Sequence, residues 1–372
     1  MNRARATIVA SMMAATVAGC SSADKPKPSP LEPLTPKIAG QQVWATKVGS
    51  VAFPLTIAVN GSTLTLAGGD GTLLALSAED GREVWRASAG ASLAAGVGSD
   101  GRFAAVVTRD NEVVVVENGG EKWRARVGSR VATAPLVAGE RVFVMGVDRV
   151  VNAFDALDGT LLWTLKRPGD ALTLAQRGVV AAFKDTLLVG QGARLTGVDP
   201  LSGSVRWEVA VATPRGANEV ERLAELVGPV LRAGEVVCVR AFQAAVGCVN
   251  AERGVLLWNK TVGGVEAIGG DAQLVVGADG SGRITAWRGA SGEVAWSSEK
   301  FLHRALSAPL VVGKTIVLGD FEGQLHFLDR DSGEPVLRLP TDGTAVAAPP
   351  IVVGSTIVVV TRGGGAFGFR PQ

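Results

Sequence analysis

The sequence is poor in the side chains on which many enzyme sites are built. It has no tyrosine and, among 372 residues, only two histidines, His303 and His326, and three cysteines. A metal site or a nucleophile–base pair that depends on histidine therefore has few residues available. Neither sign of charge is in large excess, since 37 Lys and Arg stand against 35 Asp and Glu. A nucleic-acid-binding protein needs a surplus of basic residues along one face, so we expect no nucleic acid partner.

The first twenty residues have the pattern of a lipoprotein export signal. Arg3 and Arg5 precede an apolar stretch, 6–16, and the small residues Val17-Ala18-Gly19 lead directly to Cys20. The apolar stretch is too short to span a bilayer and suits a cleaved signal. We therefore expect residues 1–19 to be a signal peptide and Cys20 to carry the lipid. The alternative is an ordinary signal peptide with an incidental cysteine.

The residues after the signal predict where the mature chain resides. Cleavage before Cys20 removes two of the basic residues and leaves 35 of each sign, a formally neutral chain. Ser21 follows Cys20, and the absence of aspartate at that position is usual for transfer to the outer membrane. No later stretch approaches the roughly 20 apolar residues of a membrane span. We expect the protein to be lipid-anchored in the outer membrane, on its periplasmic face.

Residues 20–38 predict a tether between this anchor and the folded body. Proline spacing forbids a helix and favours an extended, semi-stiff chain. The five prolines are Pro26, Pro28, Pro30, Pro33 and Pro36.

A repeat of about 40 residues fills the rest of the chain, 39–372. Its marker is a glycine followed four residues later by tryptophan, and Leu337 replaces the tryptophan in the last repeat. Only Trp287 stands outside the series, whose tryptophan pairs are Gly40/Trp44, Gly81/Trp85, Gly119/Trp123, Gly159/Trp163, Gly203/Trp207, Gly254/Trp258 and Gly292/Trp296. A large ring at a fixed place predicts packing between neighbouring units, and the glycine predicts a turn with positive φ.

Each repeat predicts four short strands. In the third repeat, runs rich in β-branched and apolar residues at 133–137, 141–144, 149–154 and 160–163 are separated by turn formers. Four strands in a period of about 40 residues are the signature of a propeller blade. Stacked helical repeats of similar period do not fit, because no segment sustains the apolar spacing of a helix.

The two ends of the chain predict how the ring closes. The last repeat has three strands, near 349–351, 356–360 and 366–369, and stops before a fourth. Residues 41–46 resemble a fourth strand with no preceding three. Pairing these segments completes the last blade and leaves no long edge exposed. We expect an all-β fold, an eight-bladed β-propeller of four-stranded blades that the N-terminal strand closes.

The turns of the repeats resemble a known docking motif. The stretches Ala153–Trp163 and Gly197–Trp207 are similar to the tryptophan-docking repeat of pyrroloquinoline-quinone-type propellers, small-x-Asp-x-x-x-Gly-x-x-x-Trp. That repeat occurs in enzymes and in non-enzymes. Two further stretches, 219–225 and 302–310 with 319–323, are more diagnostic. Together with the signal and tether, they make the whole chain resemble the BamB family, lipoprotein subunits of the outer-membrane β-barrel assembly machinery.

The resemblance implies a scaffold without catalysis, cofactor or small-molecule substrate. In that family the propeller docks on the periplasmic POTRA domains of the barrel protein BamA, through a leucine-bearing loop and an acidic insertion. The leucines match at Leu172 and Leu174. Ala175 stands where the family has arginine, and Arg177 follows two positions later.

Blade topology independently brings two insertions together. The connections that leave a blade's fourth strand share one face, so the insertions at 166–176 and 213–226 project side by side. Glu225 matches an acidic position of the family, whereas the next acidic position falls near Val227. Such loops predict apolar anchors, Leu172, Leu174, Leu223 and Leu226, and a polar rim of Arg177, Glu221, Arg222 and Glu225. The alternative is that the insertions only cap the core, with their leucines turned inward.

Cys238 and Cys248 flank a predicted hairpin turn near Gln243, which would place them opposite each other. The oxidising periplasm permits a disulfide there, although directly paired strand positions strain one. Cys248 occupies a cramped position that alanine holds in other repeats, and a free cysteine behaves as a small buried hydrophobe. The sequence therefore slightly favours two packed thiols over a bridge.

The enzyme alternative is a quinone-dependent periplasmic dehydrogenase on the same fold. Against it, His303 and His326 have no nearby companion at metal-ligand spacing, and no Gly-x-Ser-x-Gly elbow is present. No clustered acidic and asparagine set suits a Ca²⁺–quinone site. A third interpretation is a propeller lipoprotein that binds another ligand through its central channel.

Overall fold

The computed structural model describes residues 26–167, 173–214, 218 and 223–372. Within them the chain forms 32 β-strands joined by turns and loops. None of these residues belongs to a helix with the length and apolar character needed to cross a membrane.

The strands follow one another in groups of four. The first seventeen are β1 (Gly40–Lys47), β2 (Ala58–Asn60), β3 (Thr63–Ala67), β4 (Thr72–Ser77), β5 (Glu83–Ser88), β6 (Leu93–Ser99), β7 (Phe103–Thr108), β8 (Glu112–Glu117), β9 (Gly120–Arg126), β10 (Leu136–Ala138), β11 (Arg141–Met145), β12 (Val151–Asp155), β13 (Leu161–Leu165), β14 (Val180–Phe183), β15 (Thr186–Gln191), β16 (Arg194–Val198) and β17 (Val205–Ala210). The others are β18 (Leu226–Ala233), β19 (Val236–Ala241), β20 (Ala245–Asn250), β21 (Val255–Thr261), β22 (Gly269–Gly270), β23 (Leu274–Ala278), β24 (Ile284–Arg288), β25 (Val294–Ser298), β26 (Leu310–Val312), β27 (Thr315–Gly319), β28 (Gln324–Asp329), β29 (Pro335–Pro340), β30 (Ile351–Val353), β31 (Thr356–Val360) and β32 (Gly365–Pro371).

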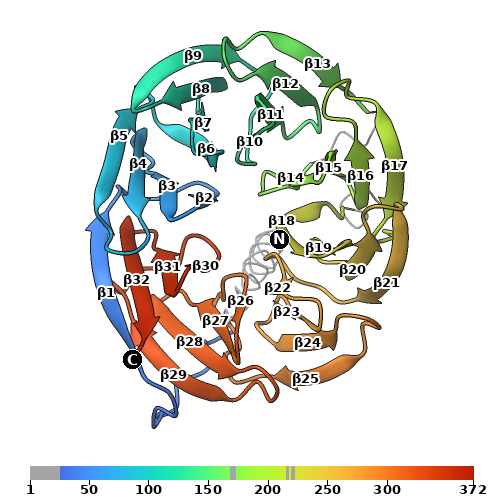
Figure 1. The fold of residues 1–372 in the computed structure, drawn as a ribbon. Helices are drawn as coiled ribbons and strands as arrows, with labels where there is room; N and C mark the ends of the chain where they lie inside the picture. The colour runs from blue at the N-terminus through green and yellow to red at the C-terminus, as the bar shows by residue number, and fades with distance from the viewer. Residues whose placement is uncertain (1–25, 168–172, 215–217, 219–222) are drawn as a thin grey trace, which may run out of the picture.

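These strands form eight antiparallel four-stranded sheets arranged as the blades of a ring (Figure 1). Blade one is β2–β5, and six more blades follow in chain order up to β26–β29. Blade eight has the order β1-β32-β31-β30, so the N-terminal strand supplies its outer edge. Gly40 pairs with Pro371 and Lys47 with Gly365 across this closure. The predicted eight-bladed propeller and its closure are confirmed.

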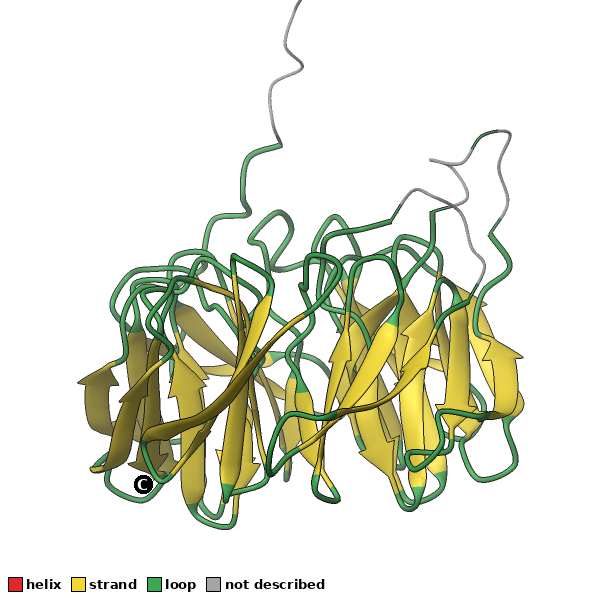
Figure 2. Cartoon of the chain, turned by 90° about the horizontal axis from the view of Figure 1, so that it is seen from above, coloured by secondary structure: helices red, strands yellow, loops and turns green. Residues whose placement is uncertain are grey.

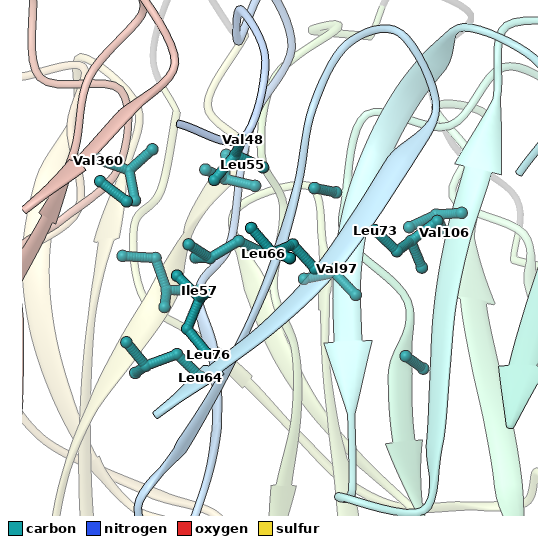
Figure 3. Close-up of a cluster of buried hydrophobic side chains, with 14 of the residues drawn as sticks. Val48, Leu55, Ile57, Leu64, Leu66, Leu73, Leu76, Val97, Val106 and Val360 are labelled. Carbon is teal, nitrogen blue, oxygen red and sulfur yellow. The ribbon is translucent and has the colours of Figure 1, made fainter. Parts of the chain in front are cut away.

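The middle strands of each blade are buried on both faces, because each sheet packs against a neighbour on either side. Every residue of β7 is buried, whereas in the outer strand β9 only Trp123 is. This explains why middle strands are continuous apolar runs and outer strands are mostly polar. Figure 3 shows Leu64, Leu66 and Leu76 of blade one in the cluster that also holds Val106 and Val360 from the neighbouring blades.

At six of the eight junctions between blades, the repeated tryptophan ring packs against the marker glycine of the next blade. The Trp123 ring lies against Gly159 of the following blade, where an added Cβ would be only 2.7 Å from the ring. Its indole N–H donates to the Ala156 carbonyl at 2.8 Å. Equivalent indole N–H bonds are made by Trp44, Trp163, Trp258 and Trp296. The predicted positive φ occurs at seven of the eight marker glycines, and Gly40, which lies against Leu337 at the closure, is the exception.

All connections from one blade to the next lie on one face of the ring, together with the turns between second and third strands. This follows because the four strands of a blade are antiparallel and are ordered from the centre of the ring outward. Figure 2 shows the long connections rising from that face, with short turns on the other. The described N-terminal segment rises from the same face as the two insertions (Figure 2). We call the face that carries the connections between blades the connection face.

Candidate functional site

Two long connections flank blade four. The first joins β13 to β14 and the second joins β17 to β18. Their predicted position on one face at adjacent junctions agrees with the sheet order. The predicted site residues Leu172 and Arg222 lie outside the described residues, as does Glu221 of the predicted rim.

Glu225 binds partners from two other parts of the chain. Its Oε1 accepts hydrogen bonds from Nε and Nη2 of Arg149, at 3.0 and 2.9 Å. Its Oε2 accepts the backbone N–H of Leu174 at 3.1 Å. Arg149 lies in the turn between β11 and β12, so one carboxylate joins blade three to both insertions. The side chains of Arg149 and Glu225 are each only 15% exposed, which strengthens their attraction compared with a surface pair.

The leucines of the insertions divide into two kinds. Leu174, whose backbone N–H binds Glu225, and Leu223, two residues before Glu225 in the chain, are half-buried. Leu226 is 2% exposed and belongs to the core between blades four and five, so the expectation that it is a surface anchor is wrong. The reason is its position as the first residue of β18, where strand pairing with Ala241 holds it inside.

Arg177 points across the ring. Its Nη2 donates to the Leu55 carbonyl at 2.7 Å. This bond links the residues just before β14 to the connection between β1 and β2. Burial lowers the pKa of the Arg177 guanidinium, and the charge of Glu266 opposes that shift. Arg177 therefore lies in the central channel and not among the exposed residues of the predicted rim.

The channel opens on the connection face as a cavity of about 650 Å³. Apolar side chains such as Phe53, Leu306 and Phe321 line it, with Arg177 and Glu266. A second cavity of about 270 Å³ lies on the other side of Arg177. Arg177 contributes to the lining of both cavities.

No group of three or more histidine, cysteine, aspartate or glutamate side chains within the described ranges is arranged to hold a metal ion. The cavity's lining also contains no cluster of acidic and asparagine side chains of the kind that a Ca²⁺–quinone site uses.

A buried polar network lies between blades six and seven. Arg304 donates from Nε to Oδ2 of Asp320 at 2.8 Å and also pairs with Glu322. His326, in β28, lies with Nε2 at 3.0 Å from the same Asp320 oxygen, and its ring is 4.5 Å from that of Phe301. Burial lowers the pKa of His326 although the hydrogen bond to Asp320 opposes the shift. Burial of Asp320 would raise its pKa, but hydrogen bonds from His326, the Gln324 backbone and Arg304 outweigh it and hold the pKa below its usual value.

Cys238 and Cys248 are joined by a disulfide, with a Cα–Cα distance of 4.0 Å. They are directly paired residues of β19 and β20, and both are buried. The sequence slightly favoured two thiols, so this preference is corrected. The close approach of two middle strands brings the sulfur atoms together in the position where other repeats have alanine.

Arg149 is a residue of this site that the sequence did not indicate. Its only local signal was its place in a turn between second and third strands, which lie on the connection face. Its partner Glu225 is 76 residues away along the chain, so no spacing rule could have found the pair.

Known proteins resemble the chain over nearly its full length. The family described as outer membrane protein assembly factor BamB matches residues 36–93 and 69–298. The BamB of Burkholderia pseudomallei is 34% identical over 100% of this chain and 99% of its own length. The BamB of Bordetella pertussis is 33% identical over 94% of this chain and 92% of its own.

Solved structures agree with the fold. The crystal structure of BamB from Moraxella catarrhalis superimposes with a TM-score of 0.80 at 20% identity, and covers 89% of this chain and 99% of that one. A quinohemoprotein alcohol dehydrogenase from Pseudomonas putida HK5 reaches 0.68 at 13% identity, and covers 91% of this chain and 78% of that one. At such low identities these likenesses show a shared propeller fold.

Proposed function

The chain belongs to the BamB family of outer membrane protein assembly factors, and from that premise we propose that it is a non-catalytic scaffold of the β-barrel assembly machinery. It binds the periplasmic POTRA domains of BamA and assists the insertion of outer membrane proteins. We propose further that residues 1–19 are removed, that Cys20 is acylated, and that the propeller, 39–372, stands at the periplasmic face of the outer membrane.

One observation carries the proposed contact. Two insertions on the same face are joined by Glu225, and each places a half-buried leucine, Leu174 or Leu223, beside that junction. Half-buried leucines on a rigid scaffold can be covered by a partner at little cost in chain entropy. Arg149 and Glu225 support this surface by linking blade three to the insertions. Their opposite charges are already paired with each other.

The experiment is a binding measurement between the non-acylated chain, residues 21–372, and purified POTRA domains. We expect the double variant Leu172→Arg, Leu174→Arg to bind at least tenfold more weakly, since two charges would have to be desolvated in an apolar contact. The matched control is Leu201→Arg, because Leu201 is 65% exposed in the β16–β17 turn on the opposite face.

Each outcome bears on a different part of the proposal. Normal binding by a folded double variant would move the site elsewhere on the propeller. No binding by the unaltered chain would reject the scaffold function. The quinone-dependent dehydrogenase then predicts a new absorbance band when quinone is added, together with reduction of a dye. Mass spectrometry of the membrane-extracted protein tests acylation at Cys20 separately.

A further inference from the structure

The segment before the first strand is held against blades six and seven. The backbone N–H of Ser29 donates to the Leu302 carbonyl at 2.9 Å. Leu31 packs against the buried cluster that contains Phe301. The groove that receives residues 29–32 is formed by the loop after β25 and by β29.

Contacts continue along the segment toward β1. Arg338 in β29 donates from Nη1 to the Glu32 carbonyl at 3.2 Å. The backbone N–H of Lys37 donates to the Val336 carbonyl at 2.8 Å. The segment is therefore bound through its backbone N–H and carbonyl groups from Ser29 to Lys37, before β1 begins at Gly40.

Arg304 connects this segment to the buried network. Its Nη1 donates to the Ser29 carbonyl at 3.1 Å, while Nε and Nη2 bind Asp320. Arg304 is 3% exposed and Asp320 is 1% exposed, and His326 contacts the same Oδ2 of Asp320 at 3.0 Å. A guanidinium fixed on one edge by a buried carboxylate presents its remaining N–H groups in a fixed direction.

We infer that Arg304, Asp320 and His326 form a clamp that fastens the proline-rich segment to the propeller at Ser29. This goes beyond the proposed scaffold function and rests, in its membrane consequence, on acylation at Cys20. With the clamp closed, nine residues, 20–28, separate the acylated cysteine from the folded body. At about 3.3 Å per residue they span at most about 30 Å. Without it, residues 20–38 would span about twice that distance.

The clamp also sets which face meets the membrane. Ser29 is bound beside the connection from β25 to β26, on the connection face that carries the two insertions (Figure 2). The lipid and the insertions therefore leave the propeller from the same side. The connection face is held toward the outer membrane, within reach of the membrane-proximal part of a partner.

The first test uses trypsin on the whole non-acylated chain, residues 21–372, and needs neither lipid nor partner. Lys25 and Lys27 precede prolines and resist trypsin, so Lys37 is the basic residue of the segment that reports its release. Ser29→Pro with Leu31→Ser removes the N–H bond and the apolar contact without touching the buried network. We expect cleavage after Lys37 to become roughly tenfold faster or more. Ser29→Ala keeps both backbone groups and is the matched control.

A second variant tests the clamp from the propeller side. In Arg304→Lys the single ammonium cannot bind Asp320 and the Ser29 carbonyl in the same geometry. We expect faster cleavage after Lys37 at a temperature where the propeller remains folded. Unchanged cleavage in both folded variants would overturn the clamp.

A third measurement tests the distance to the membrane in the acylated protein on vesicles of phosphatidylethanolamine and phosphatidylglycerol. A dye on the connection face transfers energy to acceptor lipids. We expect transfer to be stronger in the unaltered protein and in Ser29→Ala than in the Ser29→Pro, Leu31→Ser variant. Equal transfer in all three would overturn the proposed spacing, even if trypsin confirms that the segment is bound.

Discussion

The guanidinium of Arg149 and the carboxylate of Glu225, 76 residues apart in the chain, form an ion pair of 2.9 Å with both side chains 15% exposed. The same carboxylate accepts the N–H of Leu174. Blade three, the first insertion and the second insertion therefore meet at one residue. The surface that they form together depends on this junction more than on any single exposed side chain.

Removal of the Glu225 carboxylate should loosen this junction. We expect Glu225→Ala to lower the free energy of unfolding by about 2 kcal/mol, because it removes charge-assisted hydrogen bonds from a shielded site. Glu225→Gln can still accept the Leu174 N–H and should cost less. Urea unfolding measures the stability, and hydrogen exchange of the Leu174 amide measures the local opening.

The control for Glu225 is an ion pair at the surface. Lys184 and Glu252 are 3.1 Å apart, but their side chains are 55% and 49% exposed. Water screens such a pair, so Glu252→Ala should not change stability measurably. An equal loss in Glu225→Ala and Glu252→Ala would show that the junction has no special role.

The tryptophan contacts between blades predict large effects from small changes. Gly159 has a φ of 78°, and an added Cβ would be 2.7 Å from the Trp123 ring. Gly159→Ala should therefore destabilise more than Gly139→Ala, where φ is 58° but an added Cβ meets nothing within 4 Å. For Gly139→Ala we expect only the backbone cost, about 1 kcal/mol.

Truncation of the ring itself should be costlier. Trp123→Ala removes a buried indole and its bond to the Ala156 carbonyl, and we expect a loss of about 3–5 kcal/mol. Thermal unfolding of the three variants should give the order Trp123→Ala, Gly159→Ala, Gly139→Ala from least to most stable. Equal stability of the two glycine variants would contradict the role given to the ring contact.

The disulfide predicts a response to reductant. Cys238 and Cys248 close a loop of about ten residues, for which the chain-entropy estimate is about 2–3 kcal/mol. We expect dithiothreitol to lower the urea midpoint of the unaltered protein. The Cys238→Ala, Cys248→Ala variant should have a lower midpoint that reductant does not change. A midpoint of the unaltered protein that is the same with and without reductant would argue against the bond.

The buried histidine predicts acid sensitivity. Burial lowers the pKa of His326 below its unfolded value near 6.5, so the unfolded chain binds a proton that the folded protein does not. The stability that neutral His326 contributes is present above pH 6.5 and is lost as the pH falls below it. The lowered pKa of Asp320 adds a further loss in more acidic solution, below about pH 4.

Urea midpoints at pH 8.5, 7.5, 6.5 and 5.5 test this sensitivity. The midpoints at pH 8.5 and 7.5 should agree, and the midpoint should then fall as the pH is lowered to 5.5. His326→Gln should show a shallower fall between pH 7.5 and 5.5, whatever its absolute stability. An unchanged slope in that variant would assign the acid sensitivity to other groups.

Much of the fold could be predicted because its signals are local. The Gly-to-Trp spacing, the four strand-like runs and the turn residues recur every 40 residues or so, and the incomplete first and last repeats indicated the closure. The predicted strand 41–46 is β1, Gly40–Lys47, and the predicted 356–360 is β31. The innermost strands were less accurate, since the expected run 133–137 is reduced to β10, Leu136–Ala138. Near the axis the blades converge, and in six of the eight blades the innermost strand has only two to four residues.

The candidate site was predictable only in outline. The resemblance and the loop lengths indicated the two insertions, but the side chains were assigned as if each acted alone. Arg177 was expected at the rim, yet its guanidinium spans the channel to the Leu55 carbonyl. Leu226 was expected at the surface, yet it is part of the core. In both cases the side chain's direction depends on the strand that follows the loop.

The sequence by itself determined the repeat, the number of blades and the way in which the ring closes, because these follow from neighbours within one period. Only the tertiary structure decided which distant residues meet. Glu225 reaches Arg149, and Arg304 reaches Ser29 across 275 residues, because the closed ring brings turns of different blades to the same face. Such contacts have no fixed spacing in the chain, so no local pattern encodes them.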